Sequence, residues 1–313
     1  MPATAAETLA DEAGRRKQAG ALAIAAGILT ILSGALATIV YSDKPTVPLL
    51  DVMREHLSAN PPVPGLKVRQ ALFYDENAAQ VVLVSILLTL AAITMGLAMA
   101  HLYRSTQARR PELPRVALAT VLCGAGLVAV SELAIAISIV VKVHELAGSA
   151  QPTSAAARDA LVPPVALAGG LLRQLGVIML GVGWIIIALN AMRVGLLTRF
   201  MGVLGIIVGG LFIIPLGASL PILQAFWLIA LGALFLGYWP AGLPPAWTTG
   251  EAHPWPTQQE LREQRLERQA PSASPPPPSR GGRQRPEPPE TPAPEAPVRP
   301  AHSSSKKRRR KRR

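Results

Sequence analysis

The sequence has little cysteine, little charge and few aromatic residues. Cys123 is the one cysteine, which excludes an intrachain disulfide and a cysteine metal cluster. Charged residues make up 16% of the 313 residues and aromatic residues 4%, whereas 50% are hydrophobic. A soluble protein of this length carries more charge. The composition therefore indicates a membrane protein.

Catalytic motifs are also missing. The sequence has no Walker loop, no His-Glu-x-x-His zinc site and no Gly-x-Ser-x-Gly elbow. Residues 124–129 fit a loose dinucleotide fingerprint, but they lie inside an apolar run with no strand before it, so we discard the match. The histidines are scattered: they are His56, His101, His144, His253 and His302. We expect no enzyme, no cofactor and no metal site.

What the sequence does have is apolar runs long enough to cross a membrane, which takes about 20 residues. There are six, at residues 18–41, 78–102, 116–141, 165–192, 200–217 and 220–239. Abundant small residues, with 26 glycines, suit close packing of helices in lipid. The runs predict an all-α, six-transmembrane helix bundle over residues 18–239.

The first run has two interpretations. Arg15, Arg16 and Lys17 precede it, and Ala35-Leu36-Ala37 has the small-x-small pattern of a signal-peptide cleavage site. Its 24 residues exceed a usual signal core, which favours a retained span. Residues 1–17 are then a cytoplasmic N-terminal segment, although the sequence leaves cleavage open.

The basic residues near the runs predict the orientation. With the N-terminus inside, the cytoplasmic segments hold Arg15, Arg16, Lys17, Arg104, Arg109, Arg110, Arg115, Arg193 and Arg199. The outer loops hold fewer cations over more residues, and acids outnumber them. Because Lys and Arg accumulate in cytoplasmic connections, we expect both termini in the cytoplasm of a bacterial inner (plasma) membrane.

The connections between the runs carry further signals. In the first outer loop, Thr46 can cap a short helix on the membrane surface, and Pro61, Pro62 and Pro64 predict that the rest is non-helical. The fifth and sixth runs are joined by so few residues that we expect an antiparallel hairpin. Gly202, Gly205 and Gly209 form a stripe on which a neighbouring backbone can approach.

Two charges, Glu132 and Arg173, lie inside predicted spans. Counted at about 1.5 Å per residue, they are about 13.5 and 12 Å from the outer boundary. Small residues share their faces: Ala125, Ala129 and Ala136 beside Glu132, and Gly169, Gly170 and Gly176 beside Arg173. The pattern predicts an ion pair between neighbouring helices, which is cheaper than two unpaired charges in hydrocarbon.

Two roles for this pair stay open. It can fix the register of two helices, or it can serve transport, with Glu132 taking up a proton or Arg173 holding an anionic substrate. Gln174, Gln224 and Asn190 are polar groups that can contribute hydrogen bonds, and Gln224 is expected near the same depth.

Residues 240–313 differ in composition from the rest. They hold 15 of the 31 Lys and Arg and 7 of the 19 acids, a net charge of +8. Trp247 and Trp255 are expected against the headgroups, and residues 240–313 as a whole are expected to form a disordered, Pro-rich, basic cytoplasmic tail. The last eight residues are all cationic: Lys306, Lys307, Arg308, Arg309, Arg310, Lys311, Arg312 and Arg313. They predict binding to anionic lipid headgroups, with nucleic acid or the ribosome as the alternative.

Residues 190–205 (NAMRVGLLTRFMGVLG) resemble uncharacterised multi-pass bacterial integral membrane proteins, of actinobacterial type, whose function is unknown. In those proteins a span often ends in an Arg, followed by a Gly-Leu-Leu turn and a Gly-x-Leu-Gly start to the next span. The resemblance covers the last three spans and implies no activity. The sequence thus predicts an integral membrane protein of unassigned, non-enzymatic function. The alternatives are a small-solute or ion transporter and a polybasic tether. The oligomeric state stays open.

Overall fold

The computed structural model describes residues 5–46, 48–57, 65–150, 152–214, 221–240 and 242–256, together with Glu260, Arg262 and Leu266. It divides the chain into two compact units, Met1–Thr257 and Gln258–Arg313. Every regular element of the described residues is an α-helix, which confirms the predicted all-α class. The polybasic residues 306–313 lie outside the described residues, so the predictions for them stay predictions.

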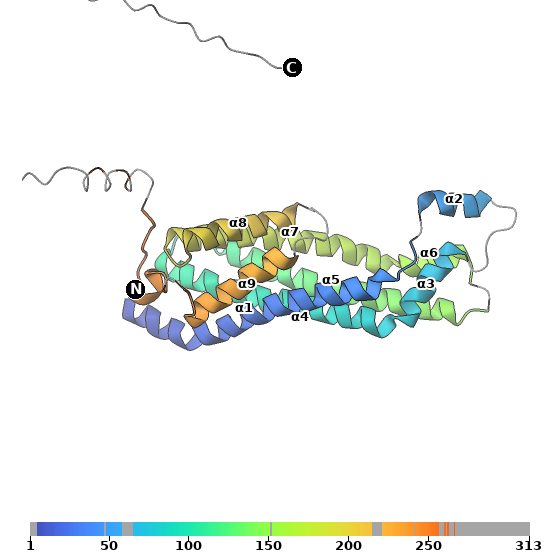
Figure 1. Ribbon diagram of the computed structural model, residues 1–313, viewed down its shortest axis with the longest axis horizontal. Coiled ribbons are helices and arrows are strands. Elements are labelled where there is room, and N and C mark those ends of the chain that lie inside the picture. The colour runs from blue at the N-terminus through green and yellow to red at the C-terminus, as the bar shows by residue number, and fades with distance from the viewer. Residues whose placement is uncertain are drawn as a thin grey trace, which may run out of the picture. The chain divides into compact units, whose positions relative to one another are not determined.

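Four helices of the described part are long and apolar enough to cross a membrane. They are α1 (Ala5–Ser42), α4 (Ala78–Arg109), α5 (Val116–Ala147) and the stretch Ser154–Arg193, which contains α6 (Ser154–Leu161) and α7 (Pro164–Arg193). Within the first unit they run alongside one another (Figure 1). Their length and composition indicate a membrane-embedded protein. Helix α1 begins at Ala5, so the polar residues ahead of the first predicted span belong to the same helix.

Two shorter apolar helices complete the bundle, α8 (Arg199–Ile213) and α9 (Pro221–Leu236). They have 15 and 16 residues, or about 22 to 24 Å at 1.5 Å per residue, which is less than a hydrocarbon core. The predicted runs 200–217 and 220–239 extend into residues 215–220, which are outside the described part. Helix α8 packs mainly on α7 and α9 mainly on α1, so the two contact each other little.

Glycines set these helix pairings. A Cβ on Gly176 of α7 would lie 2.9 Å from the carbonyl oxygen of Gly124 on α5, and a Cβ on Gly181 would lie 2.7 Å from that of Gly209 on α8. Contacts this short leave no room for a side chain, so the backbones approach directly. The predicted glycine stripe of α8 is therefore confirmed as a close-packing surface, and its partner is α7. The pairing of α1 with α9 uses Gly20 and Gly232 in the same way.

At the end of the bundle away from the chain's start lie α2 (Leu49–Leu57), α3 (Leu66–Glu76) and α6. The prediction that the loop after Pro61, Pro62 and Pro64 is non-helical is wrong, because α3 fills residues 66–76. Proline disrupts a helix only around its own position, and α3 starts beyond the last of them, after Gly65. Its buried face, Val68 and Ala71, packs against Val143 of α5 and Ala157 of α6. The predicted short helix of this loop is present as α2.

Candidate functional site

Arg109, in the last turn of α4, is a buried cation with several hydrogen-bond partners. Its side chain is 0% exposed, and the facing carboxylate of Glu12, on α1, is 9% exposed. Arg109 Nη2 lies 2.9 Å from Glu12 Oε2, and Nη1 donates to Oε1. The guanidinium thus meets both carboxylate oxygens, which is the strongest geometry for such a pair.

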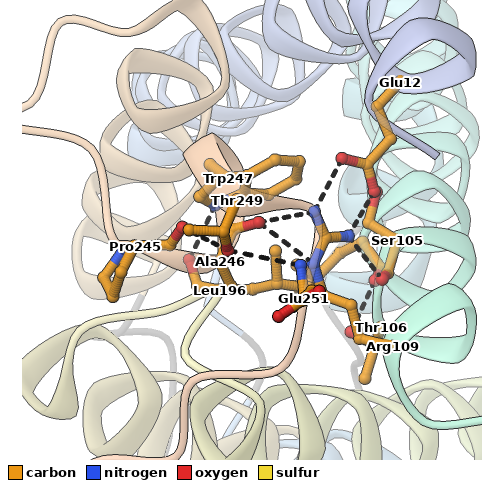
Figure 2. Close-up of polar contacts among 11 residues, drawn as sticks. Glu12, Ser105, Thr106, Arg109, Leu196, Pro245, Ala246, Trp247, Thr249 and Glu251 are labelled. Atoms are coloured by element: carbon orange, nitrogen blue, oxygen red, sulfur yellow. Dashed lines mark hydrogen bonds and ion pairs between the residues drawn. The ribbon is translucent and has the colours of Figure 1, made fainter. Parts of the chain in front are cut away.

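The remaining donors of Arg109 go to backbone carbonyls (Figure 2). Nε lies 3.1 Å and Nη2 2.7 Å from the oxygen of Ala246, at the start of α10 (Ala246–Thr249), and Nη1 lies 2.9 Å from that of Ser105. Together with the two bonds to Glu12, all five N–H groups of the guanidinium have acceptors. The buried charge is therefore fully compensated, which a buried ion pair requires in order to be tolerated.

The segment after α9 is fixed to the bundle beside this pair. Trp247 Nε1 donates to the oxygen of Leu196 at 2.8 Å, Trp255 Nε1 to that of Leu197 at 2.9 Å, and the backbone N–H of His253 to the oxygen of Val194 at 3.0 Å. All three acceptors lie in the turn between α7 and α8. We call residues 242–256 the strap, because they bind across this turn and the ends of α1 and α4. The predicted disorder from residue 240 onward is wrong for this segment, because these hydrogen bonds fix it to the bundle.

The expectation that Trp247 lies against lipid headgroups is wrong, since its residue is only 3% exposed. The Arg109 guanidinium lies 5.5 Å from its ring centroid and that of Arg16 lies 5.9 Å away, within the range of cation–π attraction. The indole also has a carbonyl acceptor inside the protein. These contacts replace the ones that a headgroup would offer.

Two cavities flank Glu12. One, of about 340 Å³, lies between α1 and α4, and its lining residues are Glu7, Asp11, Glu12, Arg15, His101, Arg104, Ser105 and Ala108. The other, of about 390 Å³, lies on the side of Trp247 and Phe235. His101 Nε2 and Ser105 Oγ, both in the lining of the first cavity, are buried without a hydrogen-bond partner among the described residues.

Glu132 and Arg173 lie next to each other. Arg173 Nη1 is 3.4 Å from Glu132 Oε1, and the two side chains are 50% and 16% exposed respectively. The contact is a single long one rather than the two parallel bonds that Arg can make. Neither residue lines the two cavities beside Glu12 or the cavity of about 660 Å³ between α1 and α3. What the pair does stays a prediction.

The faces around this pair differ from the expected arrangement. Gly169 and Gly176 do face α5, against Ile135 and Gly124, but a Cβ on Gly170 would meet open space. The alanines beside Glu132 face α4 instead of α7: Ala125 meets Gly96, and the oxygen of Ala129 accepts a hydrogen bond from Thr89 at 3.1 Å. Helix α5 packs between α4 and α7, and Glu132 lies where its two contact faces meet.

The predicted polar support for the pair has other partners. Gln224 Nε2 lies 3.7 Å from Met95 Sδ, Asn190 Oδ1 accepts from Arg110 Nη1 at 2.8 Å, and Gln174 is exposed. No hydrogen bond joins these three to Glu132 or Arg173 in the part of the chain that the structure describes. The expectation that Gln224 joins the pair is not met, because α9 packs on α1 and turns Gln224 toward α4.

The sequence interpretation missed Glu12, Arg109, His101 and Ser105 as a group. One signal was available: His101, Ser105 and Arg109 recur every four residues and therefore share one face of α4. No group of three potential metal ligands occurs among the described residues. Comparisons with models of protein families, with curated proteins and with solved structures found no match, so the chemistry of these sites rests on their own geometry.

Proposed function

We propose that this chain is a non-enzymatic integral membrane protein of the bacterial inner (plasma) membrane. It crosses the membrane six times, with both termini in the cytoplasm, and its basic tail binds anionic lipid headgroups at that face. The polybasic residues 306–313 act as an electrostatic tether, as their composition favours.

The observation that carries the proposal is the attachment of the strap to the bundle. Arg109 binds the oxygen of Ala246, and Trp247 and Trp255 bind the turn between α7 and α8. The chain therefore leaves the bundle from a fixed point, at the end that also holds the start of α1. A tether needs such a fixed origin to hold the tail's cations near one surface.

The distribution of charge supports the orientation. Cations gather around the strap and the two cavities beside Glu12. Arg15 and Arg104 line one cavity, Arg16 and Lys17 line the other, Arg199 donates to the oxygen of Pro256, and Arg110 donates to Asn190 of α7. A cytoplasmic excess of Lys and Arg is the usual determinant of membrane orientation. The tail then emerges on the same side, where the anionic lipids of the inner leaflet are found.

Lipid is favoured over nucleic acid because the eight terminal cations have no aromatic residue among them. Proteins that bind single-stranded nucleic acid combine cations with aromatic side chains on which bases stack. Near an anionic surface each Lys or Arg contributes about 1 kcal/mol, so eight of them suffice for firm attachment.

The test uses the full-length protein in nanodiscs of neutral lipid, mixed with separate vesicles of neutral or anionic lipid. We expect co-flotation with anionic vesicles only, and loss of it when residues 306–313 are all changed to Gln. A matched control changes eight Pro or Ser residues of 271–300 to Gly, which retains the charge. Equal binding to neutral vesicles, or tighter binding to RNA than to anionic vesicles at the same salt concentration, would refute the lipid tether.

A further inference from the structure

Charged and polar residues line both walls of the cavity between α1 and α4, although most of its surface comes from their carbon atoms, and the charges have an order. On α1 the carboxylates of Glu7 and Asp11 precede Arg15, which is next to the apolar part of the helix. On α4 His101 lies at the end of the apolar part, and Arg104 and Ser105 follow it. Counted along the two helices, Arg15 and Arg104 therefore lie nearer the apolar parts than the carboxylates of Glu7, Asp11 and Glu12 do.

Two buried polar atoms accompany this order. Ser105 is 2% exposed and His101 8% exposed, both residues line the cavity, and Ser105 Oγ and His101 Nε2 have no hydrogen-bond partner among the described residues. Buried polar atoms are nearly always paired in folded proteins, because leaving one unpaired is unfavourable. A ligand that enters this cavity can supply the missing partners.

The order of the charges along the cavity indicates which ligand fits it. A phosphoethanolamine group carries a phosphate and a primary ammonium, and in a phospholipid the phosphate is the part nearer the acyl chains. The phosphate would then meet Arg15 and Arg104, and the ammonium would meet Asp11 and Glu7. Asp11 Oδ1 and Arg15 Nη2 are 3.2 Å apart, and their side chains are 64% and 58% exposed, so both retain hydrogen-bonding capacity toward a ligand.

We propose that this cavity binds the phosphoethanolamine headgroup of a membrane phospholipid. Arg104 and Arg15 bind the phosphate, Ser105 donates its hydroxyl to a phosphate oxygen, and Asp11 accepts from the ammonium. A bare cation is the weaker fit, because no metal-binding group of three His, Cys, Asp or Glu side chains occurs in the described residues. The binding of the ammonium distinguishes this site from the polybasic residues 306–313, none of which is acidic.

This proposal rests on the proposed membrane embedding but not on the tail. The headgroup site and the lipid tether can therefore fail independently of each other. The test titrates the full-length protein, in detergent, with dihexanoyl phosphatidylethanolamine and with dihexanoyl phosphatidylcholine, followed by calorimetry. The choline headgroup has the same charges but no N–H donor. We expect the ethanolamine lipid to bind about tenfold tighter, the effect of one charge-assisted hydrogen bond. Equal affinities would overturn the proposal.

Variants locate the site. Arg104→Gln and Asp11→Asn, at exposed positions that leave the fold intact, should each weaken binding of the ethanolamine lipid about tenfold. Arg193→Gln and Glu112→Gln change exposed charges at the same end of the bundle and should leave the affinity unchanged. If the controls weaken binding as much as the cavity variants, the site is not this cavity.

Soluble phosphoethanolamine separates the two sources of the headgroup. Weaker binding than that of the short-chain lipid supports a membrane lipid, because acyl chains add apolar contact with the helix surfaces. If soluble phosphoethanolamine binds as tightly as the short-chain lipid, the headgroup assignment holds, but the ligand is free phosphoethanolamine and not a membrane lipid. Absence of binding by the ethanolamine lipid to the wild-type protein contradicts the site altogether.

Discussion

Glu12 and Arg109 are 97 positions apart in the sequence and form a buried ion pair that joins the first turns of α1 to the last turn of α4. The same guanidinium binds the oxygen of Ala246. One side chain thus connects the start of the bundle, its middle and the strap that follows its last helix.

Removing one partner of this pair should destabilise the protein strongly. In Glu12→Gln, Arg109 retains a buried positive charge with no counter-ion, which costs about 3 kcal/mol or more. Thermal unfolding of the detergent-purified protein should show a clearly lower midpoint. Asp11→Asn, one position earlier but exposed, is the matched control and should change the midpoint little. Equal midpoints for the two variants would mean that the pair does not stabilise the fold.

A methyl group at the crossing of α5 and α7 should be disruptive. In Gly176→Ala the new Cβ lies 2.9 Å from the oxygen of Gly124 and 2.9 Å from Leu127 Cβ, so the helices must separate. Overpacking of this kind costs about 1 to 3 kcal/mol. Gly170→Ala places the same group on the same helix in open space and should be tolerated. The two variants are compared by their thermal unfolding midpoints. A larger drop in the midpoint of Gly170→Ala than in that of Gly176→Ala would contradict this prediction.

Exchange of the charges at positions 132 and 173 should separate the two roles of that pair. If the pair fixes helix register, Glu132→Arg and Arg173→Glu should each lower the folded yield, and the double exchange should restore it. The coupling within the membrane should be about 1 kcal/mol. The transporter alternative predicts instead that Glu132→Gln abolishes solute or proton flux in proteoliposomes while folding is retained. Restored folding without restored flux would favour transport.

Cysteine accessibility should reveal the topology. In a Cys123→Ser background, we expect a membrane-impermeant maleimide to label Asp43→Cys and Ser219→Cys in intact cells, and Glu112→Cys and Glu251→Cys only after lysis. Labelling of residue 219 from outside tests whether α8 and α9 belong to complete spans. The reverse pattern would place the termini outside. Labelling of Ser219→Cys only after lysis would mean that α8 and α9 do not cross the membrane and that the four long helices are the spans.

The long helices were predictable from the sequence because hydrophobicity marks their membrane parts. Helices α4 and α5 begin at Ala78 and Val116, as predicted, but they continue to Arg109 and Ala147, beyond the predicted ends at 102 and 141. Helical hydrogen bonding does not stop where the lipid does, so hydropathy marks the membrane part of a helix and not the whole of it.

The Arg109 site was not predictable in the same way. Its partners come from α1, α4 and the strap, and no local pattern shows that these segments meet. By contrast, the proximity of Glu132 and Arg173 follows from counting residues along two consecutive spans. The faces that they share with small residues were harder to assign, because α5 has neighbours on two sides and the periodicity of one helix cannot tell which neighbour faces which stripe.

The pairing of α1 with α9 through Gly20 and Gly232 has a consequence for biosynthesis. Helix α1 obtains this partner only after some 200 further residues have been made. Until then the small-residue face of α1 is open to lipid or to other membrane chains. The strap and its bond to Arg109 form later still, so a nascent chain that stalls before α9 exposes both surfaces.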